Sequence, residues 1–304
     1  MIEPVEQYLR LGLVHFMAFP EVMKDETVLL PTIEKIALMP EFRAVEIKLV
    51  ENGKLLEPLR ALLEMSMLDL GLAAQPAILG GRLDPGTDDK ALRGRTMDVL
   101  KRHVDQAVVL GAVNVAMLSG PDPGEPRRAE ALQRTADFIA ELCDYSDLHG
   151  GPKIILEVFD REIDKKALIG PAESAAHLCE LALALGAENF GLCVDLSHLP
   201  LLDETPYEAI FPVQEYLASA HIGNAVLKQD HPLYGDQHPG FGVPEGANRV
   251  DQTRDFINML KNSGFLNRKR PPIVSFEIKP APGERSELVI AAALRVFRRA
   301  WAKA

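Results

Sequence analysis

The sequence has few cysteines, and their placement argues against a secreted protein stabilised by disulfides. Three cysteines occur among 304 residues, which is an odd number for a set of disulfide pairs. Cys143, Cys179 and Cys193 lack the spacing of a structural zinc site, and they lie in patterns typical of helices and strands. We therefore expect reduced, mostly buried thiols, as in a cytosolic protein.

Positive charge and long apolar runs are scarce as well. The formal net charge is −11, whereas binding to nucleic acid or to an anionic membrane requires a basic face. No stretch is apolar over the length that spans a bilayer, and the segment 1–6 has no basic region of the kind that begins a secretory signal. These features predict a soluble, cytoplasmic protein with neither nucleic acid nor membrane as its main partner.

A glycine-rich dinucleotide fingerprint is also missing, because no Gly-x-Gly-x-x-Gly follows an expected strand. Its absence disfavours an open Rossmann-type sheet. The chain instead alternates short apolar segments with amphipathic helical segments, without a change in composition that would mark a linker. About eight such units in roughly 300 residues predict one closed (β/α)8 TIM barrel over residues 1–304, with a long irregular loop at about 223–248.

Four of the expected strands end in a side chain that can bind a metal. The apolar runs 154–156, 191–194, 217–220 and 273–276 lead into Glu157, Asp195, His221 and Glu277. Taken alone, such a carboxylate is as often a helix N-cap or a surface residue as a functional one. Because the active sites of these barrels lie at the carboxyl ends of the strands, four ligands on consecutive strands predict one common pocket.

Such a pocket would hold three carboxylates and one imidazole, which repel one another strongly unless a cation lies among them. A set rich in oxygen with a single nitrogen suits Mn²⁺, Mg²⁺ or Co²⁺ better than a structural zinc, which prefers thiolates. We predict one divalent metal, with Mn²⁺ favoured and Mg²⁺, Co²⁺ and Zn²⁺ as alternatives.

Three further residues are candidates for substrate binding. The loop 223–248 is long for a compact domain, which favours a functional lid, and it contains His238. His15 lies in the expected first strand at 11–16, and Gln75 follows the expected strand at 68–74. The alternative for His238 is an inert surface histidine. The alternative for His15 is a core histidine that bonds a backbone carbonyl.

The motifs at the four strand ends resemble the sugar phosphate isomerase/epimerase superfamily, the xylose isomerase-like barrels. The resemblance depends on Ile155-Leu156-Glu157-Val158, Val194-Asp195-Leu196-Ser197-His198, Ala220-His221-Ile222-Gly223 and Ser275-Phe276-Glu277. It implies that the four ligands bind one divalent metal, usually manganese. It also implies that Glu157 and Glu277 exchange protons with opposite faces of the substrate through an enediolate, and that His198 contacts a substrate oxygen.

The sequence departs from this pattern after the ligand histidine. Ketose 3-epimerases of the superfamily usually continue with Gly-Glu and then an arginine that binds substrate oxygens. Here His221-Ile222-Gly223 is followed by Asn224-Ala225-Val226-Leu227, which argues against a free ketohexose as the substrate. The endonuclease branch needs further histidine and aspartate ligands for three zinc ions, and none is visible in the first four expected strands. DNA repair is therefore not expected.

A narrower resemblance connects the chain with the catalytic subunits of bacterial C-glycoside deglycosidases. It depends on Gly12-Leu13-Val14-His15-Phe16-Met17, Glu157-Val158-Phe159-Asp160, Asp164-Lys165-Lys166 and the segment 194–198. It implies metal-assisted β-elimination on 3-oxo-glycosides, in a complex with a small β-subunit. A metal-dependent sugar isomerase or epimerase acting on a small carbohydrate is the main prediction, and this lyase is the alternative.

A non-catalytic binding module is a third hypothesis. A degenerate barrel of that kind would be expected to have lost a ligand, whereas all four ligand positions are filled here. Association of the chain with itself is expected only by analogy with other barrels of this kind.

Overall fold

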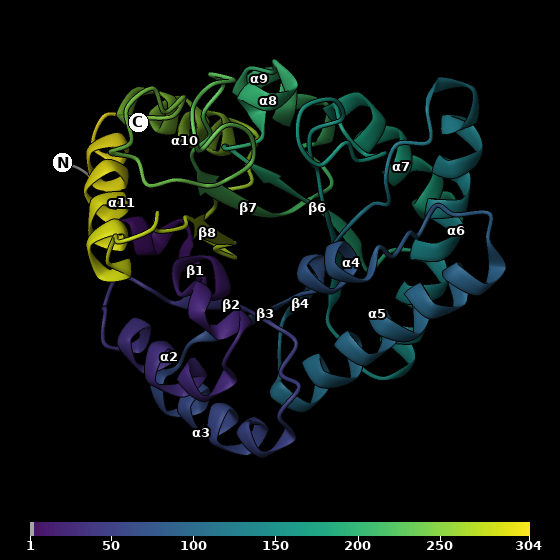
Figure 1. The fold of residues 1–304 in the computed structure, drawn as a ribbon, viewed down its shortest axis with the longest axis horizontal. Coiled ribbons are helices and arrows are strands. Elements are labelled where there is room, and N and C mark those ends of the chain that lie inside the picture. The colour runs from purple at the N-terminus through teal and green to yellow at the C-terminus, as the bar shows by residue number, and fades with distance from the viewer. Residues whose placement is uncertain (1–2) are drawn as a thin grey trace.

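The computed structural model describes residues 3–304 and shows a closed barrel of eight parallel strands that follow one another in chain order (Figure 1). The predicted TIM barrel is therefore confirmed. The strands are β1 (Arg10–Val14), β2 (Ala44–Lys48), β3 (Asp69–Ala73), β4 (Asn114–Leu118), β5 (Lys153–Glu157), β6 (Phe190–Asp195), β7 (Leu217–Gly223) and β8 (Ile273–Glu277). Pairing of β1 with β8 closes the barrel, so the strands have no open edge.

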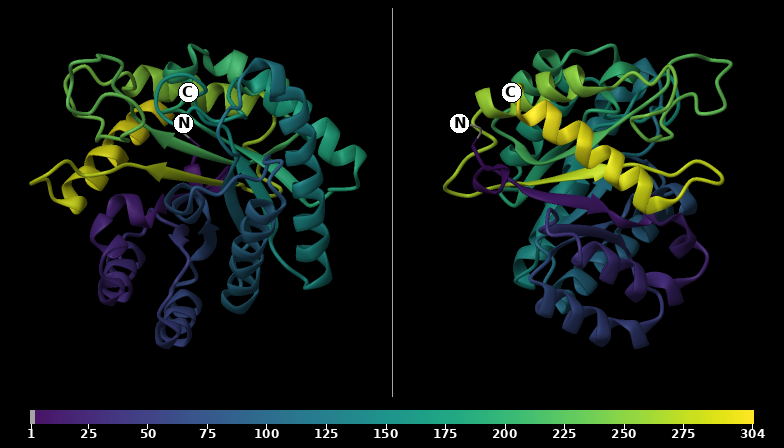
Figure 2. Two further views of the ribbon diagram at one scale, coloured as in Figure 1. Left: turned by 45° about the vertical axis from the view of Figure 1, so that its right-hand side comes forward. Right: turned by 90° about the vertical axis from the view of Figure 1, so that its left-hand side faces the viewer.

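Helices cover the outside of the barrel (Figures 1 and 2). They are α1 (His15–Ala18), α2 (Leu29–Ala37), α3 (Leu56–Ser66), α4 (Gln75–Gly81), α5 (Lys90–Leu110), α6 (Glu125–Leu148), α7 (Ala172–Ala184), α8 (Leu199–Leu202), α9 (Pro206–Ile210), α10 (Val250–Asn262) and α11 (Ser286–Trp301). Short 3₁₀ turns lie at Val5–Gln7, Pro20–Met23, Glu26–Val28, Gly53–Leu55 and Phe211–Val213. Within residues 3–304, no helix combines the length and apolarity that crossing a membrane requires.

The bounds of α5 illustrate how local sequence sets a helix. The side chain of Asp89 accepts hydrogen bonds from the backbone N–H groups of Ala91 and Leu92, which satisfies donors that the first turn leaves free. At the other end, Gly111 has a φ of 70°, a left-handed conformation that ends helices and favours glycine. The expected helix from about 89 to 110 therefore begins and ends where its capping residues stand.

The core lies between the barrel and its helices. Phe276 of β8 shows this packing, because its ring meets Phe42 edge to face at 6.2 Å and Phe297 of α11 at 5.7 Å. The two ends of the described chain also meet, since the indole N–H of Trp301 donates to the backbone oxygen of Glu3 at 2.8 Å. Figure 2 shows the N- and C-terminal segments side by side.

Two loops at the carboxyl ends of the strands are fastened to each other. In the loop after β5, the carboxylate of Asp160 accepts hydrogen bonds from the backbone N–H groups of Ile163, Asp164 and Lys165. Asp164 in turn accepts the backbone N–H of Asp236 at 2.8 Å. Asp236 belongs to the loop between β7 and α10, which projects from the barrel in Figure 2. The first loop therefore fixes the backbone of the second.

The sequence predicted that the first strand extends to residue 16, which is too far along the chain. An apolar run over 11–16 favoured a strand that included His15, but β1 ends at Val14 and His15 begins α1. Apolar runs of this length do not distinguish a buried strand from a buried helical turn. The shift changes the direction in which His15 points, and therefore its role.

Candidate metal and substrate site

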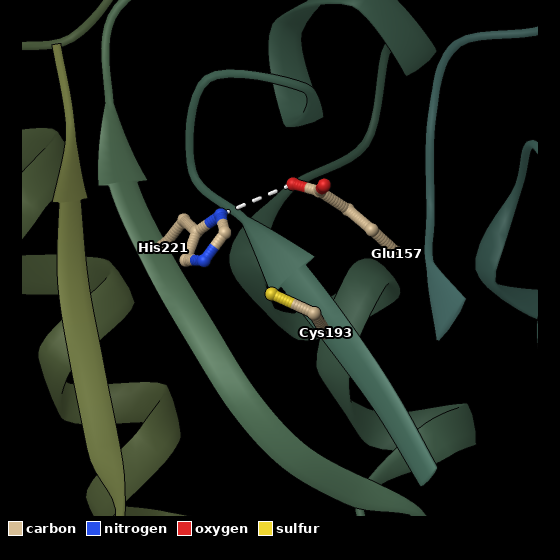
Figure 3. A group of neighbouring side chains, drawn as sticks. All are labelled: Glu157, Cys193 and His221. Atoms are coloured by element: carbon tan, nitrogen blue, oxygen red, sulfur yellow. Dashed lines mark hydrogen bonds and ion pairs between the residues drawn. The ribbon is translucent and has the colours of Figure 1, made fainter. Parts of the chain in front are cut away.

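The four predicted ligands converge at the carboxyl end of the barrel. Glu157, Asp195, His221 and Glu277 are all buried, and each offers one ligand atom within 4.8 Å of the others. Nδ1 of His221 lies 2.8 Å from Oε2 of Glu277 and 3.1 Å from Oε1 of Glu157. Figure 3 shows the latter contact, with Glu157 and His221 facing each other from different strands.

The donor atoms of this group fit a divalent cation. Oδ1 of Asp195 accepts the backbone N–H of Ser197 at 2.7 Å, whereas the buried Oδ2 has no hydrogen-bond partner among residues 3–304. An unpartnered carboxylate oxygen in the interior is costly unless a cation satisfies it. Three carboxylates with one imidazole nitrogen match Mn²⁺, Mg²⁺ or Co²⁺, and zinc also accepts such ligands.

The two glutamates of the group have different electrostatic surroundings. Burial disfavours the charged form of both. At Glu157, the nearby His221 outweighs this effect and lowers the pKa. At Glu277, burial dominates and raises the pKa. Two carboxyl groups whose pKa values are shifted in opposite directions are a common arrangement in sites that move protons.

Each glutamate also has its own neighbour. The amide Nε2 of Gln75 donates to Oε2 of Glu157 at 2.8 Å. Nε2 of His238 lies 3.4 Å from Oε1 of Glu277. The structure therefore brings Gln75 and His238, two of the predicted substrate-binding residues, to the same site. Each of them contacts the carboxylate of one glutamate.

Asp236 organises a second polar cluster beside the four ligands. Its Oδ1 lies 2.8 Å from Nε2 of His238 and 3.2 Å from Nε2 of His198, and its Oδ2 lies 2.7 Å from Nζ of Lys165. Burial alone would lower the pKa of both histidines, but Asp236 raises that of His198 to about 10 and that of His238 to about 9. Three cationic side chains therefore surround one carboxylate, and His238 also lies 3.4 Å from Glu277 and 3.7 Å from Asp195 of the neighbouring group.

Two of the predicted substrate-binding residues, His198 and His15, do not line the cavity. Nδ1 of His198 lies 2.8 Å from the backbone oxygen of Val158, and its Nε2 faces Asp236. Asp236 thus stands between His198 and the pocket, so His198 does not line it. Its predicted contact with a substrate oxygen stays a prediction, and Asp236 of the loop after β7 lines the cavity in its place.

His15 is directed away from the pocket altogether. It is fully buried, with Nε2 2.7 Å from the hydroxyl of Thr32 on α2 and its ring stacked on Phe19. As the first residue of α1, it points into the layer between barrel and helices. Residues on either side of it, Val14 and Phe16, line the pocket instead. The structure corresponds to the alternative of a packing histidine, although its partner is a hydroxyl group.

Three residues of the site were not among the predicted ones. Glu46 of β2 lies 3.2 Å from Nε2 of His221. Lys165 and Asp236 form the ion pair described above. Glu46 had a sequence signal, since it is a carboxylate at the end of an expected strand. Lys165 stood in a mixed charge run and Asp236 in an irregular loop, where sequence alone does not separate site residues from solvated ones.

Cys193 lies close to the ligands without belonging to the proposed metal site. Its Sγ is within 4.8 Å of ligand atoms of Glu157 and His221, and Figure 3 shows it on the strand between them. Burial raises the pKa of this thiol to about 12, so it stays protonated and uncharged near neutral pH.

The site opens into a cavity of about 320 Å³ with two different walls. The polar wall comes from β5 onward and consists of Glu157, Lys165, His221, Asp236, Gln237, His238, Glu277 and Lys279. The apolar wall comes from the segments after β1 and β3 and consists of Val14, Phe16, Met17, Pro20, Met23, Ala73, Pro76 and Leu79. Glu46, Gln75 and Phe159 complete the lining.

Comparison with known proteins identifies the family to which this barrel is similar. Residues 40–300 match a family described as xylose isomerase-like TIM barrel. No curated protein has a significantly similar sequence. Among solved structures, an L-ribulose 3-epimerase has a TM-score of 0.70 and 18% identity, covering 97% of this chain and 96% of that chain.

Two other structural neighbours have different names. The IolI protein, solved with a bound zinc atom, has a TM-score of 0.72 and 18% identity, covering 97% of this chain and 99% of that one. The 3-keto-D-glucoside 4-epimerase YcjR from E. coli has a TM-score of 0.67 and 14% identity, covering 95% and 98%. At identities this low, the similarity to these structures establishes the fold alone.

Proposed function

This chain belongs to the xylose isomerase-like TIM barrel family, and we propose that it is a metal-dependent sugar isomerase or epimerase. In this proposal it removes a proton from a carbon next to a carbonyl group and returns it to another position or face. The observation that carries the proposal is the convergence of two glutamates with Asp195 and His221 at the base of a pocket. The names of structural neighbours, L-ribulose 3-epimerase and 3-keto-D-glucoside 4-epimerase, support the same class of reaction.

Glu157, Asp195, His221 and Glu277 would hold the metal, for which we favour Mn²⁺. A bound divalent cation polarises a substrate carbonyl and lowers the cost of removing the adjacent proton. The buried, unpartnered Oδ2 of Asp195 supports this assignment. Asp195 does not line the cavity, so its role is confined to metal binding.

Glu157 and Glu277 are the proposed catalytic residues. Both line the cavity and approach His221 from different strands, so a sugar above them meets one carboxyl group from each side. One carboxylate takes the proton, and the other carboxyl group supplies a proton to the resulting enediolate. Gln75 holds Glu157 by a hydrogen bond at 2.8 Å, which limits rotation of the carboxylate away from the substrate.

Lys165 is proposed to donate a hydrogen bond to a substrate oxygen. It lines the cavity, and its ion pair with Asp236 holds the ammonium group in place. A fixed cation near the reacting carbons stabilises negative charge that develops on an oxygen when the proton leaves. The arginine expected of ketose 3-epimerases is missing from the sequence, and Lys165 provides a positive charge from a different loop.

Proton exchange with solvent tests the proposal without knowledge of the natural sugar. The metal-free chain is loaded with Mn²⁺ and incubated in D₂O with a panel of ketoses and 3-oxo-glucosides. We expect deuterium at a carbon next to the carbonyl of at least one sugar, detected by NMR. Glu157→Gln should abolish the exchange, and Glu204→Gln, a change outside the pocket, should leave it intact. Absence of exchange in every sugar, or full exchange in Glu157→Gln, would contradict the proposal.

The apolar wall favours a second candidate function, a lyase that acts on 3-oxo-glycosides. Met23 and Leu79 are 47% and 45% exposed, although both line the cavity. Large apolar side chains at a pocket mouth suit an apolar aglycone better than a free sugar. The same base would remove the proton beside the carbonyl. The bond from the neighbouring carbon to the aglycone would then break, and the aglycone would leave with the electron pair and take up a proton.

Release of the aglycone separates the two candidates. An aromatic 3-oxo-glycoside is incubated with the Mn²⁺-loaded chain, and products are followed by chromatography. Aglycone release without sugar interconversion would establish the lyase and overturn the first proposal. Interconversion without release would exclude the lyase for that substrate.

A further inference from the structure

Glu46 of β2 is a buried carboxylate that the proposed proton transfers do not use. Only 3% of its surface is exposed. Its two oxygens lie 3.2 and 3.3 Å from Nε2 of His221, whereas Nδ1 of the same ring faces Glu157 and Glu277. The imidazole therefore lies between Glu46 on one side and two proposed metal ligands on the other.

We propose that Glu46 is a positioning residue that holds His221 in the tautomer required for metal binding. Because Glu46 accepts a hydrogen bond from Nε2–H, the proton of the neutral ring stays on Nε2. The lone pair of Nδ1 is then directed at the space shared with Glu157 and Glu277. Carboxylates commonly fix metal-binding histidines in this way. The inference rests on the metal site of the proposed function.

Ser275 on β8 fixes the carboxylate of Glu46 in turn. Its hydroxyl donates a hydrogen bond to Oε1, the oxygen that also accepts from His221. Ser275 is the register partner of His221 across β7 and β8, so the two donors stand next to each other. A carboxylate with two adjacent donors has a defined orientation, which an isolated carboxylate in a cavity would lack.

Two glycines make room for this contact across the barrel. A Cβ at Gly12 of β1 would lie 2.3 Å from Oγ of Ser275, and a Cβ at Gly71 of β3 would lie 3.0 Å from Cγ of Glu46. Gly12 pairs with Ser275 of β8 on one side and with Ala44 of β2 on the other, so β1 separates the strands of Ser275 and Glu46. Any side chain at Gly12 would displace the Ser275 hydroxyl. The barrel interior is therefore shaped around the pair of Glu46 and Ser275.

The charge around Glu46 supports the same assignment. Within residues 3–304, His221 is the only basic side chain in contact with its carboxylate. Lys48, two residues further along β2, pairs with Glu26 instead. Glu46 thus has no structural lysine or arginine partner, and the imidazole of His221 is its partner.

Metal affinity tests the inference directly. Glu46→Gln retains the size of the side chain, but its amide can donate as well as accept and no longer specifies Nε2–H. We expect Mn²⁺ to bind 10- to 100-fold more weakly, measured by calorimetry on the metal-free chain. Ser275→Ala should weaken binding by less than tenfold. Glu204→Gln removes a half-buried carboxylate that bonds Ala172 outside the pocket, and it should bind Mn²⁺ like the wild type.

The tautomer of His221 is a second measurement. If Glu46 only packed in the barrel, its replacement would leave this tautomer unchanged. In Zn²⁺-loaded protein with ¹⁵N-labelled histidine, NMR should show His221 protonated on Nε2, with slow exchange of that proton. Glu46→Gln should shift this signal or speed its exchange. Wild-type Mn²⁺ affinity in Glu46→Gln, or a proton on Nδ1 of His221 in the wild type, would overturn the inference.

Two further outcomes are also decisive. If Glu46→Gln does not fold, Ser275→Ala decides the inference by the same two measurements, and wild-type values for it overturn the inference. Neither measurement requires turnover. A chain that binds Mn²⁺ with the expected tautomer but fails the deuterium exchange test therefore contradicts the proposed function alone.

Discussion

The two walls of the pocket come from different halves of the chain and have opposite chemistry. The polar wall begins at β5, and its side chains are ion-paired or hydrogen-bonded to one another, as in the contacts of Asp236 with Lys165 and His238. The apolar wall comes from segments that follow β1 and β3, and parts of it, such as Met23, stay exposed. One wall is a network of paired charges, and the other has apolar surface left to bury.

This difference separates chemistry from recognition. A buried network of charges holds its members in fixed positions, which proton transfer requires. An exposed apolar surface gains free energy when a ligand covers it, without specifying an orientation. We therefore expect changes in the polar wall to affect every substrate, and changes in the apolar wall to affect only substrates with an apolar group.

The largest expected effect is the loss of a catalytic carboxylate from the polar wall. Glu277→Gln should lower kcat on the order of 10²–10⁴-fold for every substrate turned over, because the proton transfer has no replacement donor or acceptor. Steady-state kinetics measures this effect, with circular dichroism to verify the fold. Equal kcat in variant and wild type would show that Glu277 only binds metal.

Asp236→Asn should destabilise the polar wall. The change removes the carboxylate that Lys165, His198 and His238 share. Among residues 3–304, His198 then has no ion-pair partner. Breaking a buried ion pair by removing one partner costs about 3–5 kcal/mol, so the free energy of unfolding should fall by that order. Urea unfolding measures it, with Asp251→Asn on the exposed face of α10 as the control. A cost below that of the control would mean that the cluster is not a paired network.

Truncation of the apolar wall should change specificity and leave the chemistry intact. Met23→Ala combined with Leu79→Ala should raise KM for an aromatic glycoside about 30-fold, because each side chain offers on the order of 1 kcal/mol of burial. KM for a free sugar should stay the same. The double change Leu38→Ala with Met65→Ala, at residues that are each 78% exposed and outside the pocket, is the matched control. An equal rise in KM for the glycoside and the free sugar would show that the apolar wall does not act on the apolar group alone.

His15 should affect stability in a way that depends on pH. Burial, with a further contribution from Lys48, lowers its pKa to about 3, whereas an unfolded histidine titrates near 6.5. Below pH 6.5 the unfolded chain therefore binds a proton that the folded chain does not. The contribution of His15 to the free energy of unfolding is therefore fully present above pH 6.5. It falls toward pH 3, by up to about 1.4 kcal/mol per pH unit.

Comparison with His15→Gln isolates that contribution from other acid-sensitive groups. The difference in unfolding free energy between wild type and variant should shrink between pH 7.5 and pH 5, as measured by urea titration. A difference that is independent of pH would mean that the pKa of His15 is the same in the folded and unfolded chains, as for a solvent-exposed histidine, contrary to its burial against Thr32.

Much of the fold was predictable because βα units repeat a simple pattern. Each buried strand leaves an apolar run, and each covering helix leaves a periodic apolar stripe, so eight alternations pointed to a barrel. The end of β1 was misplaced, because the run that includes Val14 and Phe16 continues without interruption from strand into helix. Apolar content does not mark the point where the backbone turns.

The site was predictable to the extent that it follows the strands. Glu157, Asp195 and Glu277 end their strands, and His221 stands two residues before the end of β7. Strand order alone brings these four residues together. Lys165 and Asp236 come from loops, whose paths depend on bonds such as those of Asp160 with the backbone of its own loop. Their place in the pocket could not be inferred from position along the chain.

The sequence by itself determined the barrel and the four candidate ligands, because periodic burial and strand ends are local properties of the chain. Only the tertiary structure decided which neighbours those ligands have. It placed Asp236 in front of His198, turned His15 into the packing layer, and brought Glu46 against the far nitrogen of His221. These contacts join residues far apart in the chain, and they depend on side-chain direction, which no pattern of residue types encodes.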